Sequence, residues 1–503
     1  MSESYACNVA GAVFNWLCSN DYGRGEFICR YFKISRSTLY RKVISFRHAL
    51  CTKPGHPPKD ETQTSIRQLE RKCSLLKSEN EDLMRALEEE RKRYEQNIKK
   101  LTFMLIAIGL SGRVIAWILR RAFRMPANHT DILKKAQGYA QKATAIMQAH
   151  FHQHGVVTAI DEVFIEGLPV FIAVCPQSLL ISNAGVYEKC TQENWTAFLR
   201  EMENLKGTLS DRGYALLAAV ARRSDLSHQS DIFHCIHTVK KELAKMEKKC
   251  YGLITKEEQA RVDLEKCKAS GKSARKSAAR LRRVKEACVT AIECFDNLEQ
   301  AIDMAFGALR LSHGITLNNE KQARQTLEFV SEWIQCIHPS WKKVISALRD
   351  PNLLKYMKKV HNALKKITVN SINPLDREYV LAILIYHWEE QAQRRWRGKQ
   401  VIIPKRVRTD LQRCCPNWDH LCQELFKVLE NIPKASSAVE CINSRVGFFR
   451  YSKKRFNDDF ANLISVVHNL TPFLDGKRKG KSPAEIQKVK LPTMDIFELF
   501  EIA

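Results

Sequence analysis

Long apolar runs are the first thing this sequence lacks. A helix that crosses a bilayer needs roughly 20 consecutive apolar residues. The best candidate, residues 101–110 (LTFMLIAIGL), is too short and is flanked by basic residues. The N-terminal stretch MSESYACNVAGAVF lacks the basic region and the clean apolar core of a secretory signal. We therefore expect an intracellular protein with no membrane partner.

Several catalytic signatures are absent as well. The sequence has no P-loop, no glycine-rich dinucleotide fingerprint and no nucleophile elbow. These absences argue against a P-loop nucleotidase, a Rossmann-type dehydrogenase and an α/β-hydrolase. The 17 cysteines are odd in number and scattered, and none follows a standard zinc spacing. We expect most of them to be reduced thiols.

Acidic residues are scarce relative to basic ones. The chain has 81 Lys and Arg against 55 Asp and Glu, a formal net charge of +26. Such an excess favours a polyanionic partner, with nucleic acid first. The 503 residues, of which 45% are hydrophobic, are too many for one ordinary domain and can bury several cores.

The N-terminal region, residues 1–52, reads as three short helices. They cover residues 5–19, residues 25–32 and a segment that Ser35 can cap. In the third helix Leu39 and Val43 would face inward. The side chains that would be exposed, and that suit phosphates and base edges, are Arg36, Ser37, Thr38, Tyr40, Arg41 and Lys42. This pattern predicts a DNA-binding helix-turn-helix; the alternative is a plain three-helix bundle with a basic face.

A heptad pattern follows the proline-rich linker of residues 53–64. Residues 65–100 are predicted to form a coiled coil of about three regular heptads. One seam position holds Ile66, Cys73, Asn80 and Leu87, and the other holds Leu69, Leu76 and Leu83. We expect this helix to pair protomers into a homodimer or a higher homo-oligomer, with Asn80 a candidate for setting the register. The alternative is an amphipathic helix that packs on its own protein.

Residues 101–150 offer a second helix-turn-helix. Gly109 would make the turn, Ser111 would cap the next helix, and Arg113 would be exposed on it for DNA. The signal is weaker here because the helix is very apolar, so the same residues suit a protein core equally well.

The hydrophobic period changes near residue 155. Strand-like segments and helical segments alternate in the order three strands, helix, strand, helix, strand, helix, with residues 230–237 (SDIFHCIH) as the last strand. This order is that of the ribonuclease H-like plan, an α/β fold with a mixed sheet whose first three strands are antiparallel. Asp161 ends an apolar strand and Asp211 follows another. In an open α/β sheet functional groups collect beyond the carboxyl ends of the strands, so we expect the two acids to be neighbours.

Residues 246–432 are helical in pattern and strongly basic, and a helix beginning near Ser436 and Ser437 then carries a third acid, Glu440. Close carboxylates repel each other, and a divalent cation relieves that cost. Hard cations prefer oxygen ligands. Two such ions can stabilise the attacking and the leaving oxygen when one replaces the other at a phosphorus atom. Asp161, Asp211 and Glu440 are therefore the predicted ligands of two Mg²⁺ or Mn²⁺ ions. The alternative is that an acid such as Asp211 only caps the following helix.

Three blocks, TAIDEVFI, LSDRG and SSAVECINSRV, resemble the catalytic blocks of DDE transposases. The segment DIFHCIH is similar to the C/D-x-x-H signature of Mutator-like transposases and related bacterial families, in which a helical domain is inserted before the glutamate helix. The resemblance implies that Asp161, Asp211 and Glu440 are catalytic and hold Mg²⁺, and that Asp231 and His234 support the site. Arg445 and Arg450, beyond Glu440, are further candidates for DNA contact.

The expected architecture is multidomain. It comprises a helix-turn-helix (1–52), a linker (53–64), a coiled coil (65–100), a second helical DNA-binding region (101–150), a ribonuclease H-like core in two parts (151–245 and 433–475) around an all-helical basic insertion (246–432), and a basic tail (476–503). The resemblance implies an insertion-sequence transposase that acts on double-stranded DNA in the bacterial nucleoid. Three alternatives remain open: an inactive or domesticated recombinase, a non-enzymatic DNA-binding regulator, and a ribonuclease H-type nuclease without strand transfer.

Overall fold

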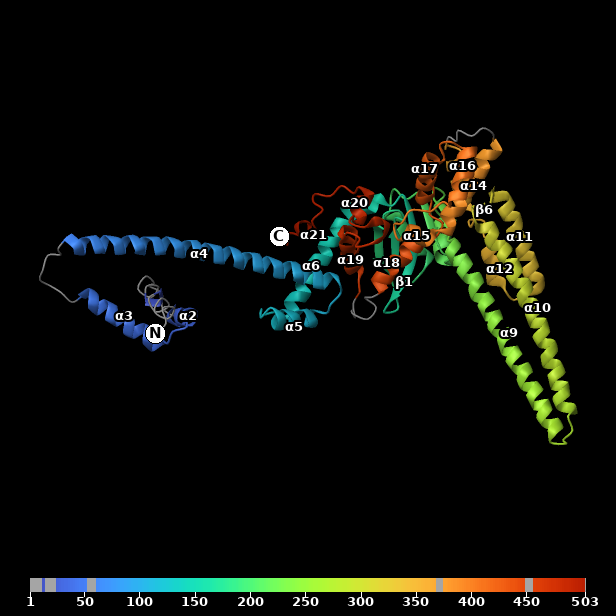
Figure 1. Cartoon of the computed structure of the whole chain (residues 1–503), viewed down its shortest axis with the longest axis horizontal. Helices are drawn as coiled ribbons and strands as arrows, with labels where there is room; N and C mark the ends of the chain where they lie inside the picture. Colours follow the sequence, from blue (N-terminus) through green and yellow to red (C-terminus); the bar gives the residue numbers. More distant parts are fainter. Residues whose placement is uncertain (1–10, 14–23, 52–59, 368–373, 448–455, 503) are drawn as a thin grey trace. The chain divides into compact units, whose positions relative to one another are not determined.

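The computed structural model describes residues 11–13, 24–51, 60–367, 374–447 and 456–502 (Figure 1). The chain divides into two compact units, Met1–Arg93 and Tyr94–Ala503, and each is described by itself. None of the helices in these ranges combines the length and the apolar composition that a bilayer crossing requires.

The first unit contains the basic helix predicted to recognise DNA. Helix α2 (Arg24–Tyr31) precedes helix α3 (Arg36–Cys51). The Ser35 hydroxyl accepts a hydrogen bond from the backbone N–H of Thr38 (3.1 Å), as expected of an N-cap. Leu39 and Val43 are buried, as their spacing predicts. The first predicted helix, residues 5–19, lies outside the described residues except for a helical segment at 11–13.

Helix α4 (Asp60–Ala107) runs without a break through the predicted coiled coil. The described leucines of the heptad seam are exposed: Leu76 is 54% exposed and Leu83 is 69% exposed. Most of the predicted linker falls outside the described residues, and the helix begins at Asp60.

The second helical region has the predicted turn. Gly109 has a positive φ of 85°, which glycine adopts without strain. Ser111 caps helix α5 (Gly112–Ala122) by accepting a hydrogen bond from Val114 N–H. Helix α5 is amphipathic, with Ile115 and Leu119 buried, and helix α6 (His129–Ile146) packs beside it.

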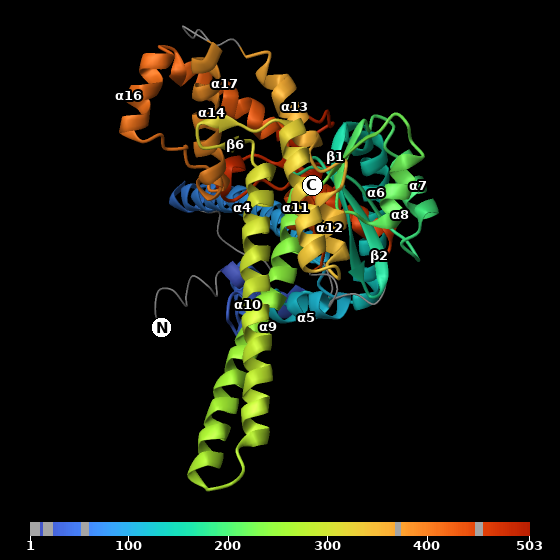
Figure 2. The same cartoon turned by 90° about the vertical axis from the view of Figure 1, so that its right-hand side faces the viewer.

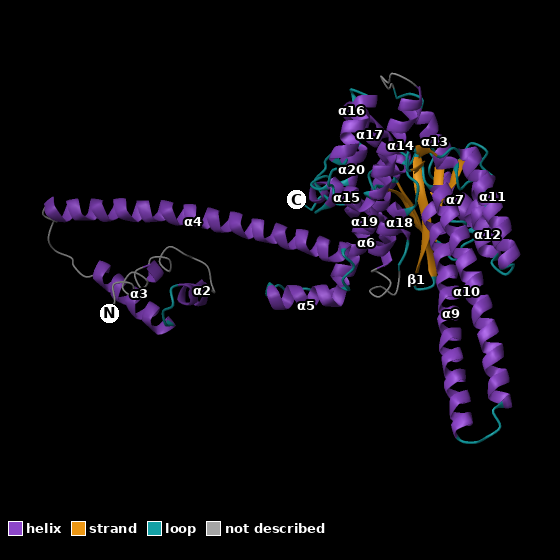
Figure 3. Ribbon diagram, turned by 45° about the vertical axis from the view of Figure 1, so that its right-hand side comes forward, coloured by secondary structure: helices purple, strands orange, loops and turns teal. Residues whose placement is uncertain are grey.

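A five-stranded mixed sheet forms the centre of the second unit (Figure 3). Its strands are β1 (Val157–Ile165), β2 (Leu168–Val174), β3 (Ile181–Val186), β4 (Gly207–Ser210) and β5 (Ser227–Ser230). Their order across the sheet is β3-β2-β1-β4-β5. Strands β1, β2 and β3 are antiparallel, as predicted, whereas β4 and β5 are parallel to β1.

Different helices cover the two faces of the sheet. Alternate β1 residues, Ala159 and Val163, share one core with α6, α18 (Ser437–Gly447) and α19 (Asp458–Leu470). Ile160 faces the other core, which it shares with α7 (Gln192–Arg200) and α8 (Tyr214–Ala221). The period-2 pattern of β1 therefore decides which helix each of its side chains meets.

Helix α19 closes the free edge of the sheet at β3. Asn469, fully buried, donates from Nδ2 to the carbonyl oxygen of Ile181 (2.9 Å) and accepts from the Ile181 N–H (2.8 Å). At the other end of the strand, Asp458 accepts a hydrogen bond from Val186 N–H (2.6 Å). These side chains satisfy backbone groups that an edge strand would otherwise leave unpaired.

The inserted region has a hydrophobic core of its own. Helices α9 and α10 form a long antiparallel hairpin (Figures 1 and 2). The described helices of the inserted region are α9 (Ile232–Ala269), α10 (Arg275–Leu309), α11 (Glu320–Ile337), α12 (Lys342–Leu348), α13 (Lys355–Leu364), α14 (Pro374–Glu390), α15 (Ala392–Trp396), α16 (Lys405–Cys414) and α17 (Trp418–Asn431). The region is not entirely helical, because β6 (Ser312–His313) pairs with β7 (Thr316–Leu317).

Two expected boundaries are wrong. The strand predicted at residues 230–237 (SDIFHCIH) is the end of β5 followed by the start of α9, so the insertion begins as a continuation of the sheet domain rather than at residue 246. The C-terminal region folds back instead of extending as a tail. Beyond α20 (Pro483–Gln487) and α21 (Ile496–Leu499), Phe500 packs against Phe103 in the core behind the sheet.

Replacing Asn469 by Ala should lower the free energy of unfolding by about 2–4 kcal/mol, because it leaves a buried N–H and C=O of β3 unpaired. Urea unfolding followed by circular dichroism measures the change. Asn297→Ala, on an exposed part of α10, is the matched control and should change stability by less than about 1 kcal/mol. Equal stability of the Asn469→Ala protein and the parent would show that the β3 edge does not depend on this side chain.

Candidate active site

Asp161 and Asp211 are brought together by the register of β1 and β4. The parallel ladder ends at the pair Ile160 and Ser210, and the next residue on each side is one of the two acids. The sequence predicts Asp161 at the end of its strand, and this prediction is wrong. Asp161 lies in the middle of β1, at the point where pairing with β4 stops. Burial, and next the charge of Asp211, raise the pKa of Asp161.

Asp161 and Glu162 are neighbours on β1 and lie on opposite faces of the sheet. Asp161 alternates with Ala159 and Val163, which face the core containing α18, whereas Glu162 alternates with Ile160, which faces α7 and α8. Alternation along β1 therefore puts the carboxyls of Asp161 and Glu162 on opposite faces of the sheet.

Helix α18 brings two polar side chains to the Asp161 face. The Asn443 amide donates to Oδ2 of Asp161 (2.7 Å). Glu440 lies one turn earlier, and residues three apart share a helix face. Its Oε1 is 3.2 Å from Nε2 of His234 on α9. This is an ion-pairing distance, but the two groups lack the alignment of a hydrogen bond.

The four side chains thus form a connected set. Asp161 contacts Asn443, Glu440 contacts His234, and the charge of His234 acts on Asp161. They come from β1, α18 and α9, elements separated by up to almost three hundred residues. The structure places Glu440 beside His234, and it is Asn443 of the same helix that touches Asp161 directly.

Asp231 has a different position from the other acids. It is the N-cap of α9, where Oδ1 accepts hydrogen bonds from the N–H groups of Phe233 (2.5 Å) and His234 (3.3 Å). Oδ2 accepts from the N–H of Ser436 (2.7 Å) and from its hydroxyl. Both oxygens are engaged and the residue is 3% exposed. Asp231 therefore joins the starts of α9 and α18 and positions His234 and Glu440.

The electrostatics of the cluster are dominated by Asp161. Burial, followed by repulsion from Asp211 and Glu162, raises the pKa of Asp161 to about 7, against the opposing effects of the Glu162 N–H and His234. The pKa of Glu162 is also raised, by burial and then by Asp211. Negative charge is therefore in excess at this end of the sheet.

The residues present fit a hard divalent cation. Carboxylate and amide oxygens are the ligands that Mg²⁺ prefers, and a cation would relieve the crowded charge on Asp161. The Oδ1 atom of Asn443 is buried and has no hydrogen-bond partner in the described residues, so it is one further oxygen available there. Within the described residues, no three or more His, Cys, Asp or Glu side chains already converge as a formed metal site.

All but one of the predicted DNA-contacting residues whose side chains are described are exposed. This applies to Arg36, Ser37, Tyr40, Arg41 and Lys42 on α3 and to Arg113 on α5, while Thr38 is partly buried. The side chain of Arg445 and the whole of Arg450 lie outside the described residues.

Three residues of the site region escaped the sequence analysis. Asn443 has a signal, because it follows Glu440 by three positions on the same helix face. Arg212, beside Asp211, forms an ion pair with Asp350 of the insertion (3.2 Å). No local sequence pattern predicts the Arg212–Asp350 ion pair, because the two residues are far apart in the sequence.

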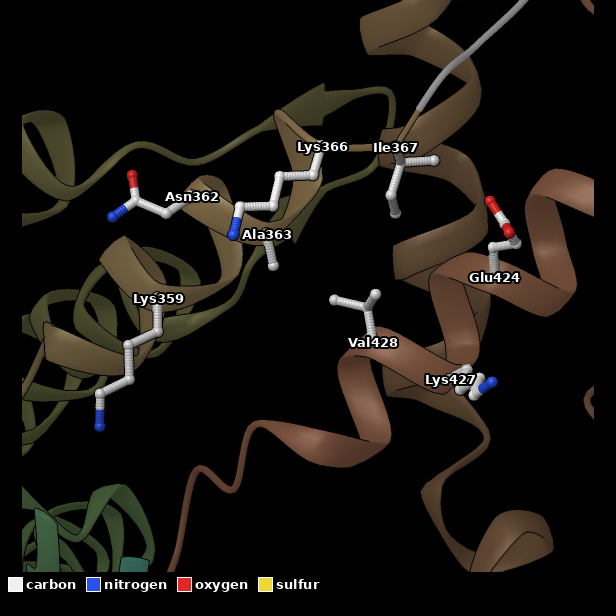
Figure 4. A pocket seen from close by; sticks show the side chains of 8 residues that line it. All are labelled: Lys359, Asn362, Ala363, Lys366, Ile367, Glu424, Lys427 and Val428. Atoms are coloured by element: carbon white, nitrogen blue, oxygen red, sulfur yellow. The ribbon is translucent and has the colours of Figure 1, made fainter. Parts of the chain in front are cut away.

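A separate hollow of about 540 Å³ lies between α13 and α17 and contains none of these acids (Figure 4). Lys359, Lys366 and Lys427 contribute to its lining. The Lys359 amine donates to Oε1 of Gln229 on β5 (3.0 Å), so this lysine is used in attaching α13 to the sheet.

Comparison with known proteins adds no relative. No family model matches the chain, and no curated protein matches its sequence.

The raised pKa of Asp161 gives a prediction about stability and pH. A carboxyl whose folded pKa lies near 7, against about 3.9 when unfolded, favours folding below pH 4, and this contribution is lost as the pH rises to 7 and above. We therefore compare the free energy of unfolding of Asp161→Asn with that of the parent at pH 4 and at pH 8. Between the two pH values this difference should shift in favour of Asp161→Asn by on the order of 2–3 kcal/mol. Urea unfolding in a metal chelator measures this.

Asp475→Asn, at an exposed position, is the control and should follow the parent at both pH values. If Asp161→Asn shows the same pH dependence as the parent, the Asp161 carboxyl is not in the crowded, buried setting described.

Proposed function

We propose that this protein is a metal-dependent DNA transposase of the DDE type, with a ribonuclease H-like catalytic domain. The observation that carries the proposal is the joint placement of Asp161 and Asp211 at the end of the β1–β4 ladder, with Glu440 facing the same region from α18. The strand order β3-β2-β1-β4-β5, with three antiparallel strands and then two parallel ones, is that of the ribonuclease H-like plan.

The chain's own residues would act as follows. Asp161, Asp211 and Glu440 would hold two Mg²⁺ or Mn²⁺ ions and leave the open side of the cluster to a phosphodiester. When bound, such ions activate the attacking oxygen and stabilise the leaving oxygen of an in-line displacement. Asn443 donates to Asp161 and would keep it oriented, and His234, which lies beside Glu440, would help to orient that carboxylate. The first displacement would use water to free 3′-hydroxyls, and the second would use those hydroxyls to join target DNA.

The distribution of positive charge supports DNA as the substrate. Exposed basic residues surround the turn between α9 and α10: Lys266, Lys268, Lys272, Arg275, Lys276, Arg280, Arg282, Arg283 and Lys285. Such a surface binds phosphates without reading sequence. Helix α3 carries exposed arginine and lysine side chains and has no acidic residue in its sequence. Recognition of terminal repeats is therefore assigned to the N-terminal helices.

The catalytic assignment is tested by joining assays. Labelled fragments spanning the flanks of the coding sequence should be joined to a plasmid when Mg²⁺ or Mn²⁺ is added. Asp161→Asn, Asp211→Asn and Glu440→Gln should each reduce joining by roughly a thousandfold or more. Glu162→Gln is the matched control, because it removes a neighbouring acid from the other face of β1, and it should keep most of the activity.

Each other outcome assigns a different function. Cleavage without joining favours a ribonuclease H-type nuclease. Specific DNA binding without any cleavage favours an inactive recombinase or a non-enzymatic regulator. Joining by the Asp161→Asn or Glu440→Gln protein at the parent's rate contradicts the assignment of the site.

The exposed heptad seam supports pairing of two copies, which would hold two element ends together. Leu76→Lys/Leu83→Lys should convert the protein to a monomer, because it places charges in the seam, and light scattering measures the mass. Gln68→Lys/Ser78→Lys adds the same charge outside the seam and should leave the assembly unchanged. Equal masses for both variants and the parent would show that this seam is not the interface.

A further inference from the structure

A hollow of about 470 Å³ lies where the insertion meets the loop that follows β4. Its charged and polar lining consists of Arg212, Lys342, Arg349, Asp350, Gln335 and Ser346. Three of these residues are cations and one is an acid. Arg212 directly follows Asp211, so the hollow is lined by the residue next in sequence to one of the candidate catalytic acids.

Arg212 is held from two sides by the insertion. Its Nη2 donates to the Ser346 hydroxyl on α12 (2.9 Å), and its Nε lies 3.2 Å from Oδ2 of Asp350 without the alignment of a hydrogen bond. The guanidinium makes no other hydrogen bond to a described residue. It therefore keeps donor capacity in a fixed orientation, which suits a tetrahedral oxyanion.

The single acid in the hollow is already engaged. Asp350 is 5% exposed, and its Oδ2 accepts a hydrogen bond from Ser230 at the end of β5 (2.6 Å). Its Oδ1 accepts from the N–H of Asn352 (2.9 Å). The loop is fixed further by Arg324, which donates to the Asp350 carbonyl (2.9 Å). The Asp350 charge thus serves to position Arg212, and the exposed charges of the hollow are those of Lys342 and Arg349.

We propose that this hollow is a phosphate subsite of the active site, in which Arg212, Lys342 and Arg349 bind a backbone phosphate of the DNA strand next to the phosphate that is cut. The inference rests on the proposed function and adds a role for the insertion. The insertion supplies two of the three cations and positions the third, so it sets the path of the strand across Asp161 and Asp211.

The test compares the full-length parent with Lys342→Gln/Arg349→Gln. Both side chains are exposed, so the fold should persist. The control Lys343→Gln/Lys358→Gln removes the same charge from exposed positions outside the hollow. Affinity for a short DNA duplex, measured against salt concentration, should fall on the order of tenfold in the first variant, with a log–log slope shallower by about one. The control should change much less in both measurements.

A second measurement locates the phosphate. Substrates in which one phosphate at a time is replaced by methylphosphonate should reveal a position, next to the scissile one, whose neutralisation slows cleavage by the parent but not by Lys342→Gln/Arg349→Gln. Equal sensitivity of the two proteins at every position overturns the subsite, as does a salt slope equal to that of the control variant.

The two proposals fail in distinguishable ways. A parent that never cuts DNA contradicts the proposed function, while the salt dependence of binding still tests the hollow. A subsite for free phosphate is a separate outcome: inorganic phosphate would stabilise the parent but not the variant against heat, with DNA affinity unchanged, and that result would overturn the assignment to DNA.

Discussion

The candidate site depends on one buried carboxylate, that of Asp231. The chain leaves the sheet domain at the start of α9 and returns about two hundred residues later at Ser436. Asp231 caps the outgoing helix and binds the N–H and hydroxyl of Ser436 on the returning segment. A buried charge of this kind is tolerated because each oxygen has donors and because the N-terminus of α9 carries partial positive charge. The return of the chain is thereby fixed, and His234 and Glu440 meet as a consequence.

The acids held by this framework oppose folding rather than support it. Asp161 is desolvated and repelled by Asp211, and the Asn443 amide, the Glu162 N–H and the charge of His234 partly offset this. Core residues around it, such as Ala159 and Val163, must supply the stability that keeps the carboxyls together. Strain concentrated in one cluster of acids is typical of a site that binds a cation or performs chemistry.

Sequence patterns predict most of the strands and several helix caps, because these depend on local periodicity and on local hydrogen bonds between side chain and backbone. The alternation in β1 puts Asp161 and Glu162 on opposite faces of the sheet, and Ser35 and Ser111 cap α3 and α5 as predicted. The same reasoning fails at residues 231–237, where a short apolar run suits a strand and a helix equally. The Asp231 side chain decides this case, because it caps a helix and needs a partner from the distant Ser436. Contacts such as Asn443 with Asp161 and Asp350 with Arg212 join remote segments, so only the folded chain reveals them.

The insertion contacts the sheet domain at β5, the strand next to the one that precedes Asp211. Ser230 at the end of β5 donates its hydroxyl hydrogen to Asp350, and Gln229 of the same strand donates to the carbonyl of Pro433, just before the glutamate helix. One strand therefore connects the loop that holds Arg212 with the segment that delivers Glu440. A shift of the insertion relative to the sheet would move both ends of the site together. It follows that the folded insertion sets the positions of Arg212 and Glu440, whereas the β1–β4 register sets those of Asp161 and Asp211. Under the proposed function, DNA held by the insertion would be aligned by these same contacts.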